Sequence, residues 1–153
     1  MVDTSKRTKG RYSRINHYYS VTICTENRVQ LFCDFDSSCL IMRELHFFSH
    51  SGNLKTICFT LMPDHLHWLF QLRNTDELSK VIGQFKSITT IKLNRYLLSS
   101  GKIWQANFYD HKLRSDEDLL NQARYIVANP PRAGLVKNVG DYPFWNCIYL
   151  NQP

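Results

Sequence analysis

Two histidines and one tyrosine could together form a reactive site. His65 and His67 are separated by one residue, and residues two apart on a β-strand point to the same side. Neutral imidazole is a common ligand of divalent metal ions, so this pair could hold a metal with positions left open for water or a phosphate oxygen. Tyr125 carries a phenol, whose oxygen can attack phosphorus and form a covalent intermediate. A metal that polarises the phosphoryl oxygen would assist that attack.

The histidine pair lies in a segment whose alternation predicts a strand over residues 65–72. One face of this strand is apolar throughout and comprises Leu66, Trp68, Phe70 and Leu72. The other face comprises His65, His67, Leu69 and Gln71. The apolar face is expected to anchor the core, which leaves the histidine face for function or for covering by a helix. A half-buried or solvated histidine pair without a metal is the alternative interpretation.

Tyr125 falls in a predicted helix over residues 115–129, which begins at Ser115 with Asp118 in the position of a capping-box acid. Pro130 and Pro131 are expected to end this helix at Asn129, because proline cannot continue the helical ladder. On a helical wheel Tyr125 lies roughly 160° from the centre of the apolar residues. Asn129 follows one turn later on the same side. The alternative is an exposed tyrosine that packs on the tail or on a partner.

Hydrophobic periodicity along the rest of the chain predicts the strands and helices that hold these side chains in place. Strands are expected at residues 18–24, 54–61, 65–72 and 102–113, and helices at 36–50, 75–98 and 115–129. The order β-α-β-β-α-β-α indicates an α+β fold of the ferredoxin-like split βαβ type. It has an antiparallel sheet with helices on one face and an extra C-terminal helix that carries the tyrosine. We expect one domain over residues 1–153, with a basic arm at 1–17 and a short tail at 132–153.

Composition and charge restrict the class of protein. The chain has 153 residues with 19 Lys and Arg against 13 Asp and Glu, a net charge of +6. A basic domain favours an anionic partner such as nucleic acid, although the charge could equally serve solubility. Five cysteines without a Cys-x-x-Cys pair indicate a reducing compartment, and we expect the cytoplasm. No apolar run is long enough for a membrane helix, and the N-terminus does not resemble a secretory signal.

Cys33, Cys39, His46 and His50 form a second combination of metal-ligand types. Their spacing and the length of the intervening segment both differ from those of zinc fingers. We therefore expect His46 and His50 to lie on an ordinary helix face.

Three ordered blocks carry a resemblance to a known family. Residues 62–69 (MPDHLHWL) resemble the His-hydrophobe-His motif of the HUH single-strand DNA nucleases. Residues 104–111 (WQANFYDH) and 125–136 (YIVANPPRAGLV) resemble blocks of the small single-tyrosine transposases. In addition to these three blocks, residues 10–32, with Val21-Thr22 and Asn27-Arg28, resemble the N-terminal block of the same transposases. The likeness covers nearly the whole chain and is greatest to the REP-associated tyrosine transposases.

This resemblance implies an activity and a site. His65 and His67 would bind Mg²⁺ or Mn²⁺, with Asn129 as a further polar ligand or, alternatively, as a cap of the helix end. Tyr125 would be the nucleophile, giving a 5′-phosphotyrosine and a free 3′-hydroxyl that can later rejoin strands. The partner would be single-stranded DNA with a hairpin, and the enzyme would act as a monomer or a homodimer. The candidates for DNA backbone contact are Lys6, Arg7, Lys9, Arg11, Arg14, Lys112, Arg114 and Arg132.

Two other functions remain open from the sequence. One is a non-catalytic nucleic-acid-binding module, since a ferredoxin-like sheet with aromatics also serves RNA binders. The RNP1-type pattern is absent from the sequence, which counts against that module. The other is a DNA-binding transposase relic without activity, which the joint presence of His65, His67 and Tyr125 argues against. If Tyr125 is not the nucleophile, Tyr109 and Tyr96 are the next candidates.

Overall fold

The computed structural model describes residues 14–74 and 77–150. Its strands and α-helices occur in the chain order expected from the sequence, with one further short helix and one further strand near the C-terminus. The elements are β1 (Tyr18–Cys24), α2 (Phe35–His50), β2 (Leu54–Met62), β3 (His65–Leu72), α3 (Leu78–Leu97), β4 (Tyr109–Leu113), α4 (Asp116–Val127), α5 (Asn129–Arg132) and β5 (Trp145–Cys147). Single 3₁₀ turns lie at Glu26–Arg28, Leu31–Cys33 and Val139–Asp141.

The five strands form one sheet in the order β4-β1-β3-β2-β5, and all neighbouring strands are antiparallel. Helix α2 connects β1 to β2 with β3 between them, and α3 connects β3 to β4 with β1 between them. This arrangement is the split βαβ fold, so the predicted ferredoxin-like class is confirmed.

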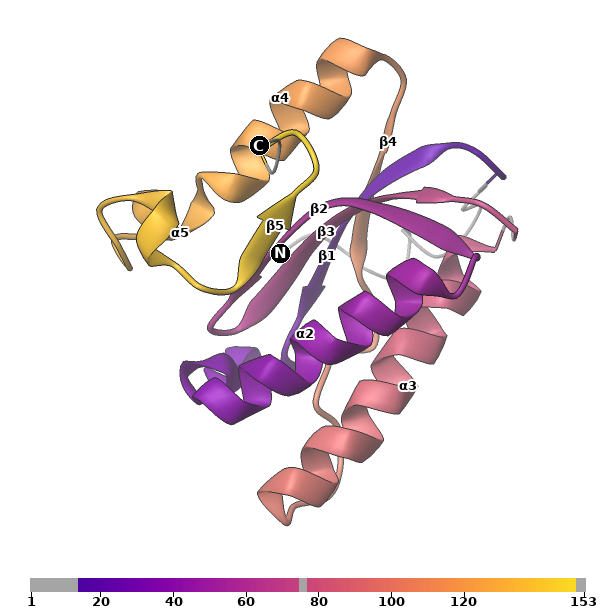
Figure 1. The fold of residues 1–153 in the computed structure, drawn as a ribbon. Helices are drawn as coiled ribbons and strands as arrows, with labels where there is room; N and C mark the ends of the chain where they lie inside the picture. Colours follow the sequence, from indigo (N-terminus) through magenta and orange to yellow (C-terminus); the bar gives the residue numbers. More distant parts are fainter. Residues whose placement is uncertain (1–13, 75–76, 151–153) are drawn as a thin grey trace.

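The sheet separates two layers of helices (Figure 1). Helices α2 and α3 pack on one face, over a core of large apolar side chains that includes Trp68, Phe70 and Phe85. Helix α4 lies across the other face, over a smaller apolar cluster that includes Leu69 and Ile126. The apolar and histidine faces of β3 therefore point to opposite layers, as its alternation predicts.

The predicted strand over residues 102–113 is too long. Only Tyr109–Leu113 form β4, while Trp104 makes an isolated bridge with Thr25. The segment between them leaves the sheet and approaches α3, where the Lys86 ammonium donates to the carbonyl of Ala106 at 3.1 Å. The alternation of residue types along the chain does not reveal this departure, because it does not show which element a segment packs against.

The predicted end of the tyrosine helix is displaced by two residues. Helix α4 begins as expected, because the Ser115 hydroxyl accepts from the backbone N–H of Asp118 at 3.1 Å. It ends at Val127 rather than Asn129, and Pro130 and Pro131 fall at the start of the short helix α5. Proline is tolerated in a first helical turn because the N–H groups there lack intrahelical acceptors.

The tail contains a strand that the sequence does not reveal. Residues Trp145–Cys147 pair with β2 and add β5 to the sheet edge. The strand has three residues, too few for a recognisable alternation. No helix in the described part of the chain is long and apolar enough to cross a membrane.

Candidate active site

The imidazoles of His65 and His67 meet on the α4 side of the sheet. Their Nε2 atoms are 3.1 Å apart and their rings are nearly perpendicular, at 88°. Strand β3 has β1 and β2 as neighbours on either side, so the backbone beneath the pair is hydrogen-bonded along both edges. The structure thus brings the two histidines together on a rigid support.

Each imidazole is oriented through its other nitrogen. The Asp64 carboxylate accepts from His65 Nδ1 at 2.6 Å, and the Thr22 hydroxyl lies 3.1 Å from His67 Nδ1. An ionised carboxylate can only accept, so the hydrogen of a neutral His65 is on Nδ1 and its Nε2 lone pair points toward His67. Such outer contacts fix the tautomer and orientation of metal-binding histidines in proteins.

Arg28 completes this chain of contacts. Its Nε donates to the second oxygen of Asp64 at 3.0 Å, and its Nη1 lies 2.9 Å from the Cys24 sulfur. Asn27 and Arg28 both have left-handed backbone conformations, with φ of 56° and 55°. Such conformations cost roughly 1 kcal/mol or more per non-glycine residue and persist where surrounding contacts determine them. The Thr25 hydroxyl supplies two of these contacts by donating to the carbonyls of Val29 and Asp64.

The environment of the pair favours neutral imidazoles. Burial, followed by the charges of His65 and Arg28, lowers the pKa of His67 to about 4. Burial also lowers the pKa of His65, against the opposing influence of Asp64. Burial alone would raise the pKa of Asp64, but its bond with His65 and the charge of Arg28 give a net lowering. At neutral pH the site therefore presents two imidazole lone pairs and an ionised carboxylate behind them.

This donor set fits a divalent metal ion. Two nitrogens bound at right angles to one ion, each about 2.1 Å from it, are about 3 Å apart. The separation of the Nε2 atoms, 3.1 Å, agrees with that value. Two facing lone pairs repel each other unless a cation or a proton lies between them. No three His, Cys, Asp or Glu side chains of the described residues surround one point, so further ligands would be amide, water or phosphate oxygens.

Tyr125 lies beside the histidine pair. Its ring centroid is 6.3 Å from that of His67, and the two rings are nearly perpendicular. The side chain is 47% exposed, which agrees with its predicted position away from the apolar stripe of the helix. Helix α4 is held to the sheet near this point, because the buried Thr60 hydroxyl of β2 donates to the carbonyl of Ile126 at 2.9 Å.

Asn129 lies one turn beyond the tyrosine, as predicted. Its amide nitrogen donates to the carbonyls of Tyr125 and Ile126 at 3.2 and 3.3 Å. The amide therefore contacts the end of α4, as a helix cap would. These bonds use the nitrogen of the amide, and a metal would take its oxygen, so the two predicted roles of Asn129 are compatible.

The predicted DNA-binding residues divide into four groups. Arg132 lies over the Tyr125 ring, with its Cζ 4.5 Å from the ring centroid. Lys112 and Arg114 line a cavity of about 470 Å³ that extends along α4 to Tyr125. Arg14 lies near His17, whose pKa is lowered by burial and by the charges of Lys112 and Arg14. The other four candidates, Lys6, Arg7, Lys9 and Arg11, lie outside the described residues.

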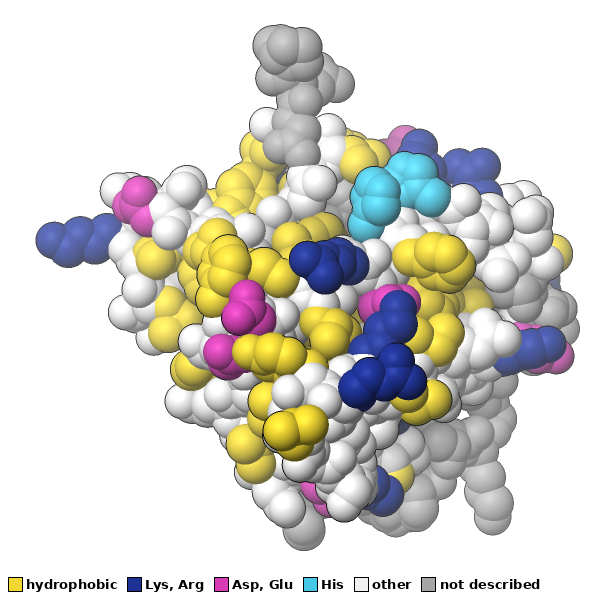
Figure 2. Space-filling model, turned by 60° about the horizontal axis from the view of Figure 1, so that its bottom comes forward, with side chains coloured by type: hydrophobic (Ala, Val, Ile, Leu, Met, Phe, Trp, Pro, Cys, Tyr) yellow, Lys and Arg dark blue, Asp and Glu magenta, His cyan; other side chains and the backbone are white. Residues whose placement is uncertain are grey.

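Basic side chains are not confined to the neighbourhood of Tyr125. On the face of the molecule that Figure 2 shows, Lys and Arg side chains lie among hydrophobic ones. The net charge of the chain therefore does not locate the site. Its position comes from the histidines and the tyrosine.

His46 and His50 lie on α2, as the sequence predicts. Their rings are 4.1 Å apart, and His50 Nδ1 is 2.8 Å from the carbonyl of His46. Both side chains are exposed on a regular helix.

Sequence reasoning missed the residues that orient the histidines. Asp64 precedes His65 directly, and a carboxylate beside a candidate metal ligand was a usable signal. Thr22 and Arg28 lie 45 and 36 residues from their respective partners, His67 and Asp64, so only the fold brings them there.

Comparisons with known proteins show which family the chain belongs to. A family model described as "Transposase IS200 like" matches residues 13–129. A Haemophilus influenzae protein provisionally assigned as a REP-associated tyrosine transposase is 35% identical over 100 residues, covering 59% of this chain and 57% of the relative. The REP-associated tyrosine transposase of Escherichia coli K12 is 30% identical over 87 residues, covering 56% of this chain and 50% of that protein. The chain thus matches about half the length of these two relatives.

A solved structure has the same fold. It is a REP-associated tyrosine transposase bound to a REP hairpin, and it superposes with a TM-score of 0.75 at 23% identity. The match covers 88% of this chain and 79% of the other. Since the family model spans more than half of the sequence, including His65, His67, Tyr125 and Asn129, the chain belongs to the IS200-like transposase family.

Proposed function

We propose that the chain is a metal-dependent single-strand DNA nuclease and strand transferase, which acts in DNA transposition at hairpin-bearing repeats. The observation that carries this proposal is the position of Tyr125. Its ring centroid is 6.3 Å from that of His67, whose Nε2 lies 3.1 Å from the Nε2 of His65. The family match and the names of the relatives support the same class of reaction. A relative of the same fold was solved with a REP hairpin, which supports hairpin DNA as the substrate class.

In the proposed reaction the Tyr125 oxygen attacks a backbone phosphorus. A phosphorus–oxygen bond forms to the tyrosine, which loses its proton, and the bond to the 3′-oxygen breaks. The departing oxygen takes up a proton and becomes a free 3′-hydroxyl, while the 5′-phosphate stays on the protein. The step is reversible because the phosphotyrosine bond retains the energy of the bond that was broken. Attack by a 3′-hydroxyl on this bond joins strands.

Mg²⁺ or Mn²⁺ would be held by His65 and His67, with the amide oxygen of Asn129 as a further ligand. When bound, the ion would polarise a phosphoryl oxygen and stabilise charge in the transition state. Asp64 and Thr22 would hold the imidazoles in the required orientation. Arg132 would keep the tyrosine ring in place from the side of α5.

We further propose that residues 1–153 act as one nuclease domain in the cytoplasm. The basic arm at 1–17 and the side chains of Lys112 and Arg114 would contact the DNA backbone, and the tail at 132–153 supplies Arg132 and β5. Tyr125 lies beside the histidines of its own chain, which supports catalysis by a monomer. A homodimer that exchanges tyrosine helices would show activity when Tyr125→Phe and His67→Ala proteins are mixed, whereas a monomer would not.

The decisive experiment is a covalent-adduct assay. The protein is mixed with Mn²⁺ and labelled hairpin-bearing single strands from the DNA beside its gene, and adducts are separated on a denaturing gel. We expect an adduct in the wild type and a loss of about three orders of magnitude or more in Tyr125→Phe, because the nucleophile is removed.

Tyr109→Phe is the matched control for this assay. Tyr109 pairs with Thr22, which pairs with His67, so it lies on the same face of the sheet, two strands away. It is expected to leave the adduct unchanged. An adduct that survives in Tyr125→Phe would move the nucleophile elsewhere. DNA binding without any adduct in the wild type would favour the binding module or the relic.

A further inference from the structure

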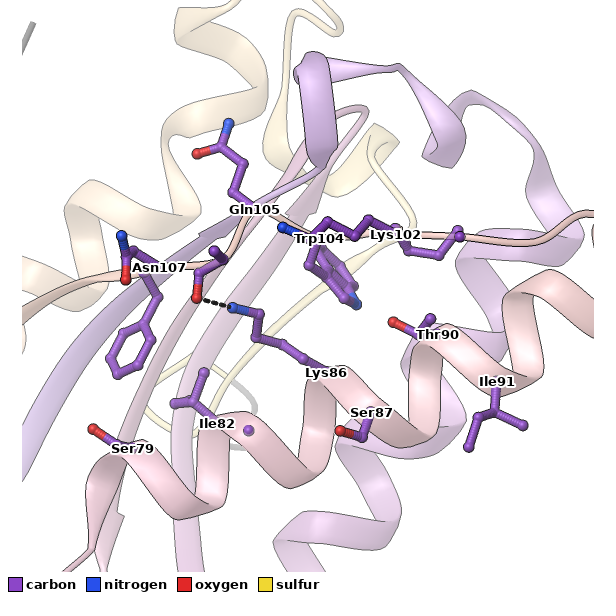
Figure 3. A pocket seen from close by; sticks show the side chains of 15 residues that line it. Ser79, Ile82, Lys86, Ser87, Thr90, Ile91, Lys102, Trp104, Gln105 and Asn107 are labelled. Atoms are coloured by element: carbon purple, nitrogen blue, oxygen red, sulfur yellow. Dashed lines mark hydrogen bonds between the residues drawn. The ribbon is translucent and has the colours of Figure 1, made fainter. Parts of the chain in front are cut away.

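A second cavity lies on the opposite layer of the molecule, between α3 and the segment that precedes β4. Its volume is about 800 Å³, larger than the cavity beside Tyr125 and within the usual range of ligand sites. Figure 3 shows α3 as one wall and residues 102–107 as the other, with the Lys86 side chain reaching across from helix to segment. We call this cavity the α3 groove.

The floor of the α3 groove is apolar and firmly held. Its base includes Ile82, Trp104 and Phe108, whose side chains are buried, and its lining also includes Ile91, which is 59% exposed. The indole N–H of Trp104 donates to the Thr89 hydroxyl at 2.8 Å, and its ring packs against Phe32 at 5.5 Å between centroids. A planar, largely apolar group could rest against the exposed part of this lining without displacing the buried base.

The rim of the groove is polar and positively charged. Lys86 and Lys102 line it, together with the amides of Gln105 and Asn107, and none of the described residues that line it is acidic. Amides bind the edges of nucleobases, and ammonium groups bind phosphates. An apolar floor with a cationic, amide-bearing rim matches an unpaired nucleotide.

The outer wall of the groove is hydrogen-bonded to the end of β1, the strand next to the one that carries the histidine pair. The backbone N–H of Gln105 donates to the carbonyl of Cys24 at 2.9 Å, and its side-chain amide donates to the carbonyl of Thr25. Cys24 pairs directly with His65. The outer wall of the groove therefore lies at the same end of the sheet as the candidate active site, on the opposite face.

We infer that the α3 groove binds unpaired nucleotides of the DNA strand whose neighbouring phosphate is held at Tyr125. This inference rests on the proposed function and adds a base-reading site to it. One strand would then contact both layers: its phosphate on the α4 side and its bases on the α3 side. Selection of the cleavage position would come from the groove rather than from the catalytic residues.

Gly83 offers a direct way to close the groove. It lies in the interior of α3, where a Cβ would meet no atom within 4 Å. Gly83→Leu therefore places a side chain into open groove space, and the helix gains from the replacement of glycine. Gln84→Leu is the matched control, since Gln84 is the next residue of the same helix, is exposed and does not line the groove.

The experiment measures affinity for two labelled probes by fluorescence anisotropy. One is a hairpin with unpaired nucleotides on both sides, from the DNA beside the gene, and the other is the same hairpin trimmed of them. We expect the wild type to prefer the tailed hairpin and Gly83→Leu to lose about tenfold or more of its affinity for it. Gln84→Leu should match the wild type, and the trimmed hairpin should bind all three proteins equally.

Other outcomes overturn the inference. Equal affinity of Gly83→Leu and wild type for the tailed hairpin would show that no strand enters the groove. An equal loss of Gly83→Leu affinity for both probes would show that the groove binds the paired stem and not the unpaired nucleotides. Lys102→Ala is a second variant that alters only a surface side chain, and it should lower the slope of affinity against salt by about one for the tailed probe alone.

The adduct assay separates this inference from the proposed function. At saturating tailed DNA, Gly83→Leu should still form the Tyr125 adduct, because no catalytic side chain is altered. If Gly83→Leu loses its preference for the tailed hairpin but still forms the adduct, the result supports nucleotide binding in the α3 groove. If Gly83→Leu forms the adduct and binds the tailed hairpin as well as the wild type does, nucleotide binding in the groove is refuted and the proposed function is unaffected.

Discussion

The two faces of the sheet differ in what fills them. Toward α2 and α3, the sheet carries a continuous core with many buried aromatic rings, including Trp68, which is completely buried. Toward α4, the described apolar cluster has no aromatic ring that is fully buried, and it gives way to the polar pair of His65 and His67. Strand β3 supplies both faces through alternate residues. One strand can thus obtain its rigidity on one side and present chemical groups on the other.

The largest expected effect is on the core face. Trp68→Ala should lower the free energy of unfolding by about 3–5 kcal/mol, because it leaves a cavity beneath the sheet and removes contacts with Phe48, Phe70 and Phe85. Denaturant unfolding followed by circular dichroism measures this change. A loss below about 1 kcal/mol would contradict the assignment of stability to this face.

The adjacent residue tests the other face. His67→Ala should lower Mn²⁺ affinity by about 100-fold or more, beyond the range of an outer-shell change, while destabilising the fold less than Trp68→Ala. Isothermal titration calorimetry gives the affinity, and thermal melting gives the stability. Unchanged Mn²⁺ affinity would refute the metal site.

A smaller effect is expected from the groups behind the histidines. Asp64→Asn should lower Mn²⁺ affinity by about tenfold, because an amide supports His65 less well than a carboxylate and presents a donor toward Arg28. Calorimetry on this variant and on Arg28→Ala, which leaves the carboxylate in place, measures the contribution of each group. If Asp64→Asn binds Mn²⁺ as the wild type does, the carboxylate does not orient a ligand.

The smallest effect concerns the attachment of α4 to the sheet. Thr60→Val removes the hydroxyl that donates to the carbonyl of Ile126 and should cost about 1 kcal/mol of stability. Adduct formation should slow by a small factor, since Tyr125 stays on an intact helix. The melting temperature measures the change in stability, and single-turnover kinetics measure the rate of adduct formation. Complete loss of the adduct would mean that α4 depends on this single contact, which the apolar cluster beneath it argues against.

Local patterns were sufficient for much of the fold. The alternation in residues 65–72 predicts β3 and the side on which the histidines lie, and the structure has the strand at His65–Leu72. The apolar stripe of α4 likewise predicts an exposed Tyr125. The tail is different, because a three-residue strand such as β5 depends on the edge of β2 that it joins.

For the site, local sequence spacing is enough to predict which groups share a face: two imidazoles two residues apart, and a tyrosine with an asparagine one turn later. Such relations follow from the fixed periods of strand and helix, so neighbouring residues suffice to encode them. Three further contacts depend on the packing of the whole chain: Tyr125 lies beside His67, Arg28 reaches Asp64, and Arg132 covers the tyrosine ring. The first two contacts join residues far apart in the chain, and the third depends on the turn from α4 into α5. Their geometry follows from how the sheet and its two helical layers pack, which no local spacing specifies.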